Sequence, residues 1–457
     1  MENVEYFKDK NVLVLGLAVS GYNAALLLNR LGSNVVVNDF KDLSANPEAQ
    51  DLEDKGIKVI SGGHPLEILK KPLDFIVKNP GIPYSNPLLK RALEKKIKII
   101  TEVELAYRIS ESPIIAITGT NGKTTTTMMC EALLNENRLN GEAYAVGNIG
   151  IPASLVAQNS SKKDDLVLEI SSFQLMGIDK FHPMIAVITN IYSAHLDYHN
   201  SREEYVKAKM AITKNQKESD YIIFNQDQEE LVQLVRTESK AKPIPFSRKT
   251  ELKYGACIKN GMIVFNGEEV MPTDHVLIPG EHNLENALAA IVVAKIKGVS
   301  NNNIKHAFYK FKGVKHRMQH VETLDGRAFY NDSKATNSLA TINALESFSK
   351  PVILIAGGLD REESHEDLIP VLKKNVKTLV TFGETKNQLA EVAKKANIDT
   401  VIVKETVSDA TQAGFKNSQE GDIILLSPAC ASWDQYNNFE ERGDDFIETV
   451  KGLGLSI

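Results

Sequence analysis

The most informative stretch of this sequence is Ile114–Thr125, which reads IIAITGTNGKTT. The apolar run Ile114–Ile117 predicts a buried strand, and the glycines after it let successive backbone N–H groups turn toward one point. Such a loop is typical of nucleotide phosphate binding, and Lys123 would reach the terminal phosphates while Thr124 offers its hydroxyl to Mg²⁺. The candidate ATP-binding residues of this loop are Gly119, Thr120, Asn121, Gly122, Lys123, Thr124 and Thr125. A usual P-loop has four residues between its glycines, whereas this one has two.

Apolar runs around this loop predict a parallel sheet covered by helices. Leu166–Leu168 and Ile185–Ile188 are expected to be strands of that sheet, and Asn283–Lys297 a helix that stops at Gly298. Short strands and glycine-rich turns over residues 225–280 suggest a small antiparallel addition. We therefore expect a central P-loop-type ATPase domain over residues 112–312.

Strands alternating with helix-length intervals predict a Rossmann-like domain on each side of the central one. The N-terminal domain, residues 1–111, is expected to end in a connecting helix and turn over Thr101–Pro113. Its expected strands are Val12–Leu15, Val35–Val37, Phe75–Val77 and Ile97–Ile100. Those of the C-terminal domain, residues 313–457, are Ala328–Tyr330, Val352–Ile355, Thr378–Phe382, Thr400–Val403 and Ile423–Leu426. The predicted fold class is α/β with three domains.

A second glycine turn follows the first expected strand and opens a helix at Gly16-Leu17-Ala18-Val19-Ser20-Gly21. The free N–H groups of that helix could hold a diphosphate, and Asp39 at the end of the next strand could accept bonds from a ribose or a base. In the dinucleotide fingerprint the middle position is glycine, and Ala18 crowds the approach of a pyrophosphate there. A tight turn without a ligand is the alternative, and an NAD-dependent oxidoreductase is less favoured.

Polar side chains follow several other strands. Glu169 ends Leu166–Glu169 next to the phosphate loop, where a carboxylate is placed to hold Mg²⁺, although a solvated acid at a strand end is the alternative. The cluster Asn190–His199 could bind metal or be a hydrogen-bonded loop. Further polar runs are His316-Arg317, Asn331–Asn337 and Leu426–Tyr436. We interpret Cys430 in the last run as a small packed residue and not a nucleophile.

Composition excludes several classes of protein. The chain has 457 residues with 53 basic and 59 acidic side chains, a net charge of −6, and no basic stripe of the kind that binds nucleic acid. Three cysteines far apart argue against a disulfide framework or a zinc knuckle. The polar start is not a signal peptide, and no apolar run reaches the roughly 20 residues that span a bilayer. We expect a cytoplasmic protein.

The order of motifs along the whole chain resembles that of the Mur ligases. The motifs are GTNGKTT, LEISSFQL, HLDYH, YVKAK, HNLENALAA, HRMQ, NDSKATN and LSPACASWDQYNNFEERG. The first is shared by all Mur ligases and by folylpolyglutamate synthetases, whereas NDSKATN and the last motif are much more specific to the member that adds D-glutamate to UDP-N-acetylmuramoyl-L-alanine. The resemblance implies an ATP- and Mg²⁺-dependent ligase of peptidoglycan precursor synthesis that works through an acyl phosphate. We expect a monomer with small-molecule partners and neither nucleic acid nor membrane.

The resemblance also implies roles for single residues. Lys123, His195 and Lys209 would be catalytic, with Lys209 carbamylated; Thr124, Glu169, His195 and Lys209 would hold metal. The UDP sugar would contact Gly16, Leu17, Ala18, Gly21, Asp39 and Asn148. ATP would also contact Asn283, Asn286, Arg317 and Asp332. D-Glutamate would contact Lys334, Thr336, Arg361, Ser432 and Phe439.

Two positions depart from the family pattern. Ala194 stands where many Mur ligases have aspartate before the matched histidine, so metal help from that position is absent. Arg361 stands where some relatives carry lysine, and its planar fork would grip a carboxylate differently. A folylpolyglutamate synthetase would lack the N-terminal domain of about 110 residues, so this alternative is less favoured. A non-catalytic nucleotide-binding module is also less favoured, because it would give no reason for Glu169, Lys209 and NDSKATN to occur together.

Overall fold

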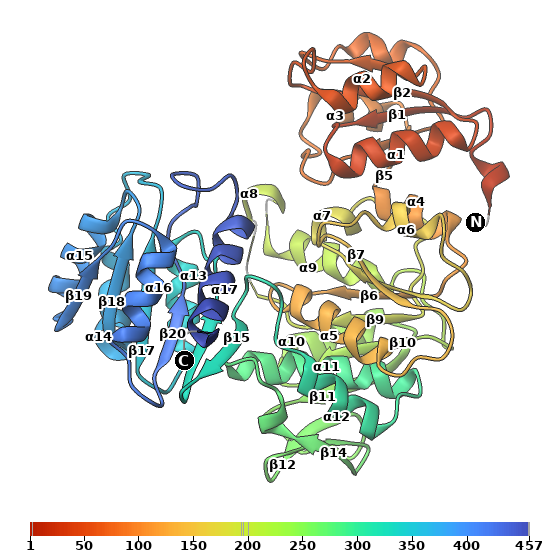
Figure 1. Ribbon diagram of the computed structural model, residues 1–457. Helices are drawn as coiled ribbons and strands as arrows, with labels where there is room; N and C mark the ends of the chain where they lie inside the picture. The colour runs from red at the N-terminus through yellow and green to blue at the C-terminus, as the bar shows by residue number, and fades with distance from the viewer. Residues whose placement is uncertain (2, 193, 195, 200, 456–457) are drawn as a thin grey trace. The chain divides into compact units, whose positions relative to one another are not determined.

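The computed structural model describes residues 1, 3–192, 194, 196–199 and 201–455 (Figure 1). Two compact units make up the chain, Met1–Thr273 with Glu285–Ala307 and Asp274–Leu284 with Phe308–Ile457. Two sheets lie in the first unit and a third in the second. The expected α/β architecture with largely parallel sheets is confirmed, while the domain boundaries at 111/112 and 312/313 stay predictions.

The first sheet is parallel and has the strand order β3-β2-β1-β4-β5. Its strands are β1 (Asn11–Leu15), β2 (Asn34–Asn38), β3 (Lys58–Ile60), β4 (Phe75–Lys78) and β5 (Lys98–Ile100). The helices around it are α1 (Val19–Arg30), α2 (Pro47–Asp54), α3 (Pro87–Glu94) and α4 (Glu102–Ile109). The chain adds β2 and β3 on one side of β1 and β4 and β5 on the other. Ligands bind at such switch points, and Gly16 directly follows β1.

The second sheet has the order β14-β13-β12-β11-β10-β9-β6-β8-β7. Its strands are β6 (Ile114–Thr118), β7 (Ala143–Gly147), β8 (Asp165–Glu169), β9 (Ile185–Ile188), β10 (Tyr221–Asn225), β11 (Lys242–Ser247), β12 (Ala256–Lys259), β13 (Met262–Phe265) and β14 (Glu268–Pro272). All neighbours from β7 to β12 pair in parallel, whereas β12, β13 and β14 pair antiparallel. The antiparallel addition expected within residues 225–280 is therefore confirmed for these last strands.

Helices flank this second sheet, and β6 lies inside it between β8 and β9. They are α5 (Lys123–Asn135), α6 (Ala153–Ala157), α7 (Ser172–Leu175), α8 (Leu196–His199), α9 (Arg202–Met210), α10 (Glu229–Glu238), α11 (Glu281–Ile296) and α12 (Asn301–Lys310). Every residue of β6 is buried, as the apolar run predicted. The phosphate loop thus leaves the sheet from a strand that is fixed on both sides.

The third sheet has the order β15-β16-β20-β17-β18-β19, parallel except for β15. Its strands are β15 (Gln319–Leu324), β16 (Arg327–Asn331), β17 (Val352–Gly357), β18 (Val376–Phe382), β19 (Thr400–Val403) and β20 (Ile423–Leu426). Its helices are α13 (Ser338–Glu346), α14 (Ile369–Asn375), α15 (Lys386–Lys395), α16 (Val407–Lys416) and α17 (Phe439–Leu455). Phe329, Ile355 and Phe446 belong to its own apolar core.

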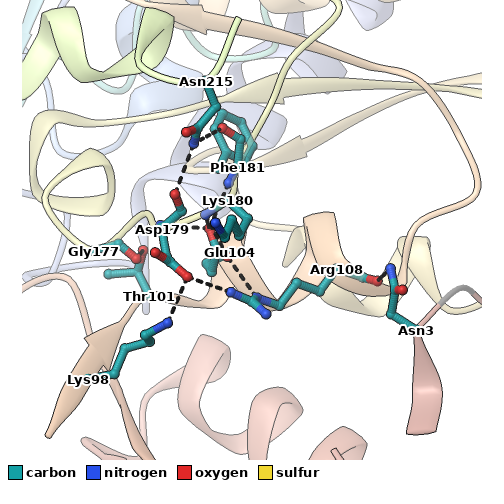
Figure 2. Close-up of polar contacts among 10 residues, drawn as sticks. All are labelled: Asn3, Lys98, Thr101, Glu104, Arg108, Gly177, Asp179, Lys180, Phe181 and Asn215. Carbon is teal, nitrogen blue, oxygen red and sulfur yellow. Dashed lines mark hydrogen bonds and ion pairs between the residues drawn. The ribbon is translucent and has the colours of Figure 1, made fainter. Parts of the chain in front are cut away.

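A buried carboxylate joins the end of the first sheet to the second sheet (Figure 2). Glu104 of α4 accepts hydrogen bonds from the backbone N–H groups of Asp179, Lys180 and Phe181, and from Nε of Arg108 at 2.7 Å. These three backbone donors precede β9. One apolar core also continues through this joint, from strand β1 to strand β10. The first unit therefore carries two sheets as one packed body.

Candidate active site

The phosphate loop between β6 and α5 is shaped by two close approaches. Gly119 has φ +150°, and a Cβ there would lie 1.9 Å from Oγ1 of Thr189. Gly122 has φ +81° and caps α5, and a Cβ there would lie 2.2 Å from Oδ1 of Asn286. Gly122 is the N-cap of α5 and has no side chain to cap it, and the backbone N–H groups that open a helix after such a glycine turn form a site that suits an anion.

Residues after β9, among them Asn190 of the polar cluster predicted there, support this loop from behind. The carbonyl of Asn190 accepts from the N–H of Thr120 at 3.0 Å, and its side-chain Oδ1 accepts from the N–H of Asn121 at 2.9 Å. The hydroxyl of Tyr205 lies 2.9 Å from Oγ1 of Thr120. Thr189 was not predicted from the sequence, and its place directly after a strand that neighbours the loop strand is the signal that could have found it.

Two lysines meet the loop at the same carbonyl. Lys123 Nζ donates to the carbonyl oxygens of Gly119 and Thr120 at 3.0 and 2.9 Å, and Lys209 Nζ donates to that of Gly119 at 2.7 Å. Lys209 is 2% exposed and lies over the Tyr205 ring. Burial, assisted by the charge of Lys123, lowers the pKa of Lys209 to about 6. The Lys209 amine is therefore largely neutral at pH 7, although the polar composition of its helix is typical of a solvent-exposed one.

Glu169 ends β8 beside the loop and is 2% exposed. Its Oε1 accepts from Nδ2 of Asn148 at 2.8 Å, whereas its Oε2 is buried without a hydrogen-bond partner among the described residues. A buried carboxylate oxygen without a donor is costly unless a cation or donor arrives. Oxygen ligands suit Mg²⁺, so Glu169 and the Thr124 hydroxyl fit this ion. Asn148 lies at this site, directly after β7 of the second sheet, whereas the other UDP-sugar candidates lie beside the first sheet.

The second glycine turn is also held in place by its neighbours. Gly16 has φ +94°, and a Cβ there would lie 2.8 Å from Cβ of Asn79. The carboxylate of Asp39 accepts from the N–H of Leu17 at 2.7 Å, so it fixes the turn itself. Ala18 precedes α1, whose first turn has no side-chain cap among the described residues. Together with Gly21 in α1, these candidates lie at one edge of the first sheet.

In the second unit the candidates follow adjacent parallel strands. Asp332 comes directly after β16, Ser432 lies beyond β20 and Arg361 beyond β17, so these loops leave the same edge of the sheet. The carboxylate of Asp332 is buried and accepts from the N–H of Met318 at 3.1 Å and from Oγ of Ser427 at 3.0 Å. Burial raises the pKa of Asp332 to about 7.

Arg442 organises these loops, and it was not predicted from the sequence. This α17 residue is fully buried, and its Nε and Nη2 donate to Oγ and the carbonyl of Ser333 at 3.0 and 2.8 Å. Its Nη1 donates to the carbonyl of Cys430 at 3.0 Å. Burial lowers the pKa of Arg442 to about 10. The guanidinium thus ties the loop after β16 to the loop after β20; its charge in a helix gave no sign of burial.

The D-glutamate candidates lie around these tied loops. Lys334 is exposed with Nζ 5.4 Å from the ring centre of Phe439, and the guanidinium of Arg361 lies 5.0 Å from that of Trp433. Ser432 is 2% exposed. Thr336 follows Lys334 and Ala335 in the same loop and is half-buried.

The other residues predicted from the sequence lie as follows. His195 lies outside the described residues. Asn286 packs on the phosphate loop, Asn283 donates to the carbonyl of Pro279 at 2.6 Å, and Arg317 follows the αL residue His316. The thiol of Cys430 is buried, and burial raises its pKa to about 11, in agreement with a packed residue.

No helix in the described part of the chain has both the length and the apolar character to cross a membrane. Three family descriptions match the sequence: a MurD-like N-terminal domain of Mur ligases over residues 10–101, the Mur ligase middle domain over 117–294, and the Mur ligase glutamate ligase domain over 316–430.

Full-length relatives agree with these matches. The UDP-N-acetylmuramoylalanine--D-glutamate ligase of Enterococcus faecalis is 56% identical over 454 residues and that of Listeria monocytogenes serotype 4b is 53% identical over 453 residues, each alignment covering 99% of both chains. In fold, the chain is similar to the crystal structure of UDP-N-acetylmuramate-alanine ligase MurC from Thermotoga maritima, with a TM-score of 0.56, 20% identity, and coverage of 97% of this chain and 100% of that one. The chain belongs to the Mur ligase family.

Proposed function

We propose that this protein is an ATP-dependent ligase that adds D-glutamate to UDP-N-acetylmuramoyl-L-alanine in peptidoglycan precursor synthesis. The observation that carries the proposal is the convergence of Lys123, Lys209 and Glu169 on one phosphate loop. The names of relatives 51–56% identical over nearly the whole chain support the choice of substrates. The MurF ligase of Thermotoga maritima, a neighbour in fold with a TM-score of 0.54, is described in complex with ADP.

The first step is transfer of the γ-phosphoryl group of ATP to a carboxylate. A carboxylate oxygen of the alanyl group attacks the γ-phosphorus, the bond to ADP breaks, and an acyl phosphate forms. Attacking and transferred groups are both anionic, so Lys123 and the loop N–H groups must stabilise the charge that develops. Mg²⁺, when bound by Thr124 and Glu169, supplies further positive charge at this point.

We assign Lys209 a carbamate in the working enzyme. A neutral amine adds CO₂, forming an N–C bond and releasing one proton, and the buried Lys209 amine is of that kind. Its contact with the Gly119 carbonyl places the product beside the phosphate loop. The added carboxylate would give the metal a second anionic oxygen ligand. His195 is proposed as a further catalytic residue on the family resemblance alone.

The second step is attack of the D-glutamate amine on the acyl carbon, with loss of phosphate. Lys334, Thr336, Arg361, Ser432 and Phe439 are the residues to which we assign D-glutamate. Asn283, Asn286, Arg317 and Asp332 are assigned to ATP, and the turn from Gly16 to Gly21 with Asp39 and Asn148 to the UDP sugar. Water would hydrolyse the acyl phosphate, so its exclusion is a requirement of the site.

We further propose three domains, residues 1–111, 112–312 and 313–457, for the UDP sugar, ATP and the amino acid. The reaction is placed in the cytoplasm, on a monomer with small-molecule partners. The residues assigned to D-glutamate offer enough hydrogen-bond donors for both of its carboxylates. An amino acid with one carboxylate would leave some of these donors unpaired, which is costly, so the site should be selective.

The test is phosphate release from ATP, with and without UDP-N-acetylmuramoyl-L-alanine and D-glutamate. We expect release only when all three substrates are present, and rejection of D-alanine by roughly 10⁴-fold, because it lacks the side-chain carboxylate. L-Glutamate should also be rejected, since inversion of its centre misplaces the amine. A comparable kcat/KM for L-glutamate, lysine or diaminopimelate would show that the protein is a different member of the family.

A further inference from the structure

Lys78, at the carboxyl end of β4, is a buried lysine whose charge has no carboxylate beside it among the described residues. The residue is 1% exposed. Its Nζ donates to the carbonyl oxygens of Asn79, Pro80 and Ile82 at 3.2, 3.1 and 2.9 Å, and lies 3.3 Å from the hydroxyl of Tyr198. Within the ranges that the structure describes, Lys78 takes part in no ion pair. Four oxygen atoms with partial negative charge are therefore its protein partners.

Burial of an ammonium without a counter-ion is unfavourable, and most buried charges are paired. The Tyr84 ring, 5.0 Å from Nζ, and the Tyr198 ring, 6.0 Å away, add only weak attraction. Burial lowers the pKa of Lys78 to about 8, which leaves the charged form dominant at pH 7. The neighbours of Lys78 thus explain its hydrogen bonds but leave its charge uncompensated.

The turn that Lys78 holds, residues 79–82, packs on the Gly16 turn. In the sheet register Lys78 pairs with Leu15, which precedes Gly16, and the N–H of Asn79 donates to the Leu15 carbonyl at 2.8 Å. A Cβ on Gly16 would meet Cβ of Asn79 at 2.8 Å and Cδ1 of Ile82 at 3.0 Å. A change at Lys78 would therefore be transmitted directly to the backbone of the glycine turn.

The position of this charge relative to the uncapped α1 matters. Nδ2 of Asn79 donates to Oγ of Ser20 in the first turn of α1 at 3.4 Å, so the turn at 79–82 lies beside the N-terminus of this helix. Helix N–H groups and a nearby fixed cation both favour an anion, and the effect is greatest where water is excluded. A diphosphate is the anion that a helix N-terminus after a glycine turn takes.

We propose that Lys78 is a positioning residue for the UDP sugar, which holds the turn at 79–82 against the Gly16 turn and supplies the positive charge that the diphosphate balances. The inference rests on the proposed function, because it takes the ligand of the Gly16 turn to be a nucleoside diphosphate sugar. It adds a residue that none of the sequence motifs brought forward.

The test compares binding of UDP and of uridine by calorimetry, for the full-length wild type, Lys78→Gln and Lys78→Met. Glutamine keeps N–H donors for the carbonyls and removes the charge, whereas methionine removes both. We expect UDP affinity to fall by about 10-fold or more in both variants, as for loss of a charge-assisted contact. Uridine affinity should be unchanged in Lys78→Gln, because uridine carries no diphosphate.

Lys95→Met is the matched control. Lys95 also donates from Nζ to a carbonyl, that of Leu69, but lies before β5, at the amino end of a strand of the same parallel sheet. The affinities of the Lys95→Met variant for UDP and for uridine should equal those of the wild type. The KM for ATP should also stay constant in all three variants, since the phosphate loop belongs to another sheet.

An unchanged ratio of UDP to uridine affinity in Lys78→Gln overturns the inference. Equal loss of both affinities also overturns it, because that result assigns Lys78 a structural role without a charge effect. If Lys78→Met does not fold, Lys78→Gln alone decides. If the wild-type enzyme releases no phosphate from ATP with UDP-N-acetylmuramoyl-L-alanine and D-glutamate, the proposed function is wrong. A failure of the proposed function can therefore be distinguished from a failure of the inference about Lys78.

Discussion

The phosphate loop of the first unit and the tied loops of the third sheet use buried polar groups in opposite ways. At the phosphate loop, Glu169 keeps a buried oxygen without a partner among the described residues, and Lys209 is buried with a lowered pKa. In the third sheet, the buried groups of Arg442 and Asp332 bond to the protein itself. The first region is built to be completed by charged ligands, whereas the second uses its buried groups to fix loop shape.

The largest effect should come from the phosphate loop lysine. Lys123→Ala removes a preorganised charge at the site of phosphoryl transfer, so we expect turnover to fall by about 10²-fold or more. UDP-sugar affinity should stay near that of the wild type, because Lys123 opens α5 beside the second sheet, whereas the Gly16 turn follows β1 of the first. Steady-state phosphate release and calorimetry measure both quantities. If the variant kept more than half of the wild-type activity, Lys123 would not have the proposed role in phosphoryl transfer.

Lys209→Ala should cost nearly as much, about 10²-fold in turnover, if the carbamate holds metal. The matched control is Lys207→Ala, which alters an exposed lysine of the same helix and should leave turnover intact. Small carboxylates should partly restore Lys209→Ala, because they replace the missing anionic ligand. Density for an unmodified amine at Lys209 in crystals of the fully active enzyme, grown near neutral pH, would refute the carbamate.

A smaller and more selective effect is expected at Arg442. A lysine side chain, with its single nitrogen, could not reach Ser333 and Cys430 together, so Arg442→Lys should raise the KM for D-glutamate by about 10-fold, in the range of one lost charge-assisted bond. The KM for the UDP sugar should not change. Arg327→Lys, at the amino end of β16, serves as the control in the same sheet. Equal KM for D-glutamate in both variants would break the contrast between the two regions.

The last expected effect concerns stability and not turnover, and it is a pH dependence that arises from Asp332. Its pKa is raised from 3.8 to about 7 in the folded protein, so the folded state binds more protons than the unfolded state between these values. The stability that Asp332 contributes is therefore full below about pH 4, near the ordinary pKa of an aspartate, and is lost as pH rises toward the folded-state pKa. Asp332→Asn should remove this slope in chemical unfolding curves recorded from about pH 3.5 to about pH 8, a range that spans both pKa values. Parallel wild-type and variant curves would show that Asp332 titrates normally.

Much of the fold could be predicted from the sequence because its strands are short apolar runs. Ile114–Ile117 and Ile423–Leu426 needed no other information, and the glycine turns marked where ligands meet the sheets. Strand β7, Ala143–Gly147, was missed because small residues carry a weak strand signal. Strand β3 was missed because it has only three residues.

The candidate site was less accessible, since burial of charged residues is a tertiary property. Lys209 lies on a helix with exposed Lys207, and the residue pattern does not tell which lysine points inward. Arg442 and Lys78 look like surface charges in sequence and are almost completely buried. Their partners are mainly backbone carbonyls, which no side-chain motif records. Carbamylation of Lys209 entered through family resemblance alone.

The claim that the phosphate loop region activates a carboxylate, to which the amino acid is then added, can be tested by following one oxygen atom. UDP-N-acetylmuramoyl-L-alanine labelled with ¹⁸O in both carboxylate oxygens is incubated with ATP and D-glutamate, and the phosphate is analysed by mass spectrometry. Attack of the carboxylate on the γ-phosphorus predicts one ¹⁸O in each phosphate released and one in the new amide. Phosphate without ¹⁸O would contradict the account, because the carboxylate would then never have been phosphorylated.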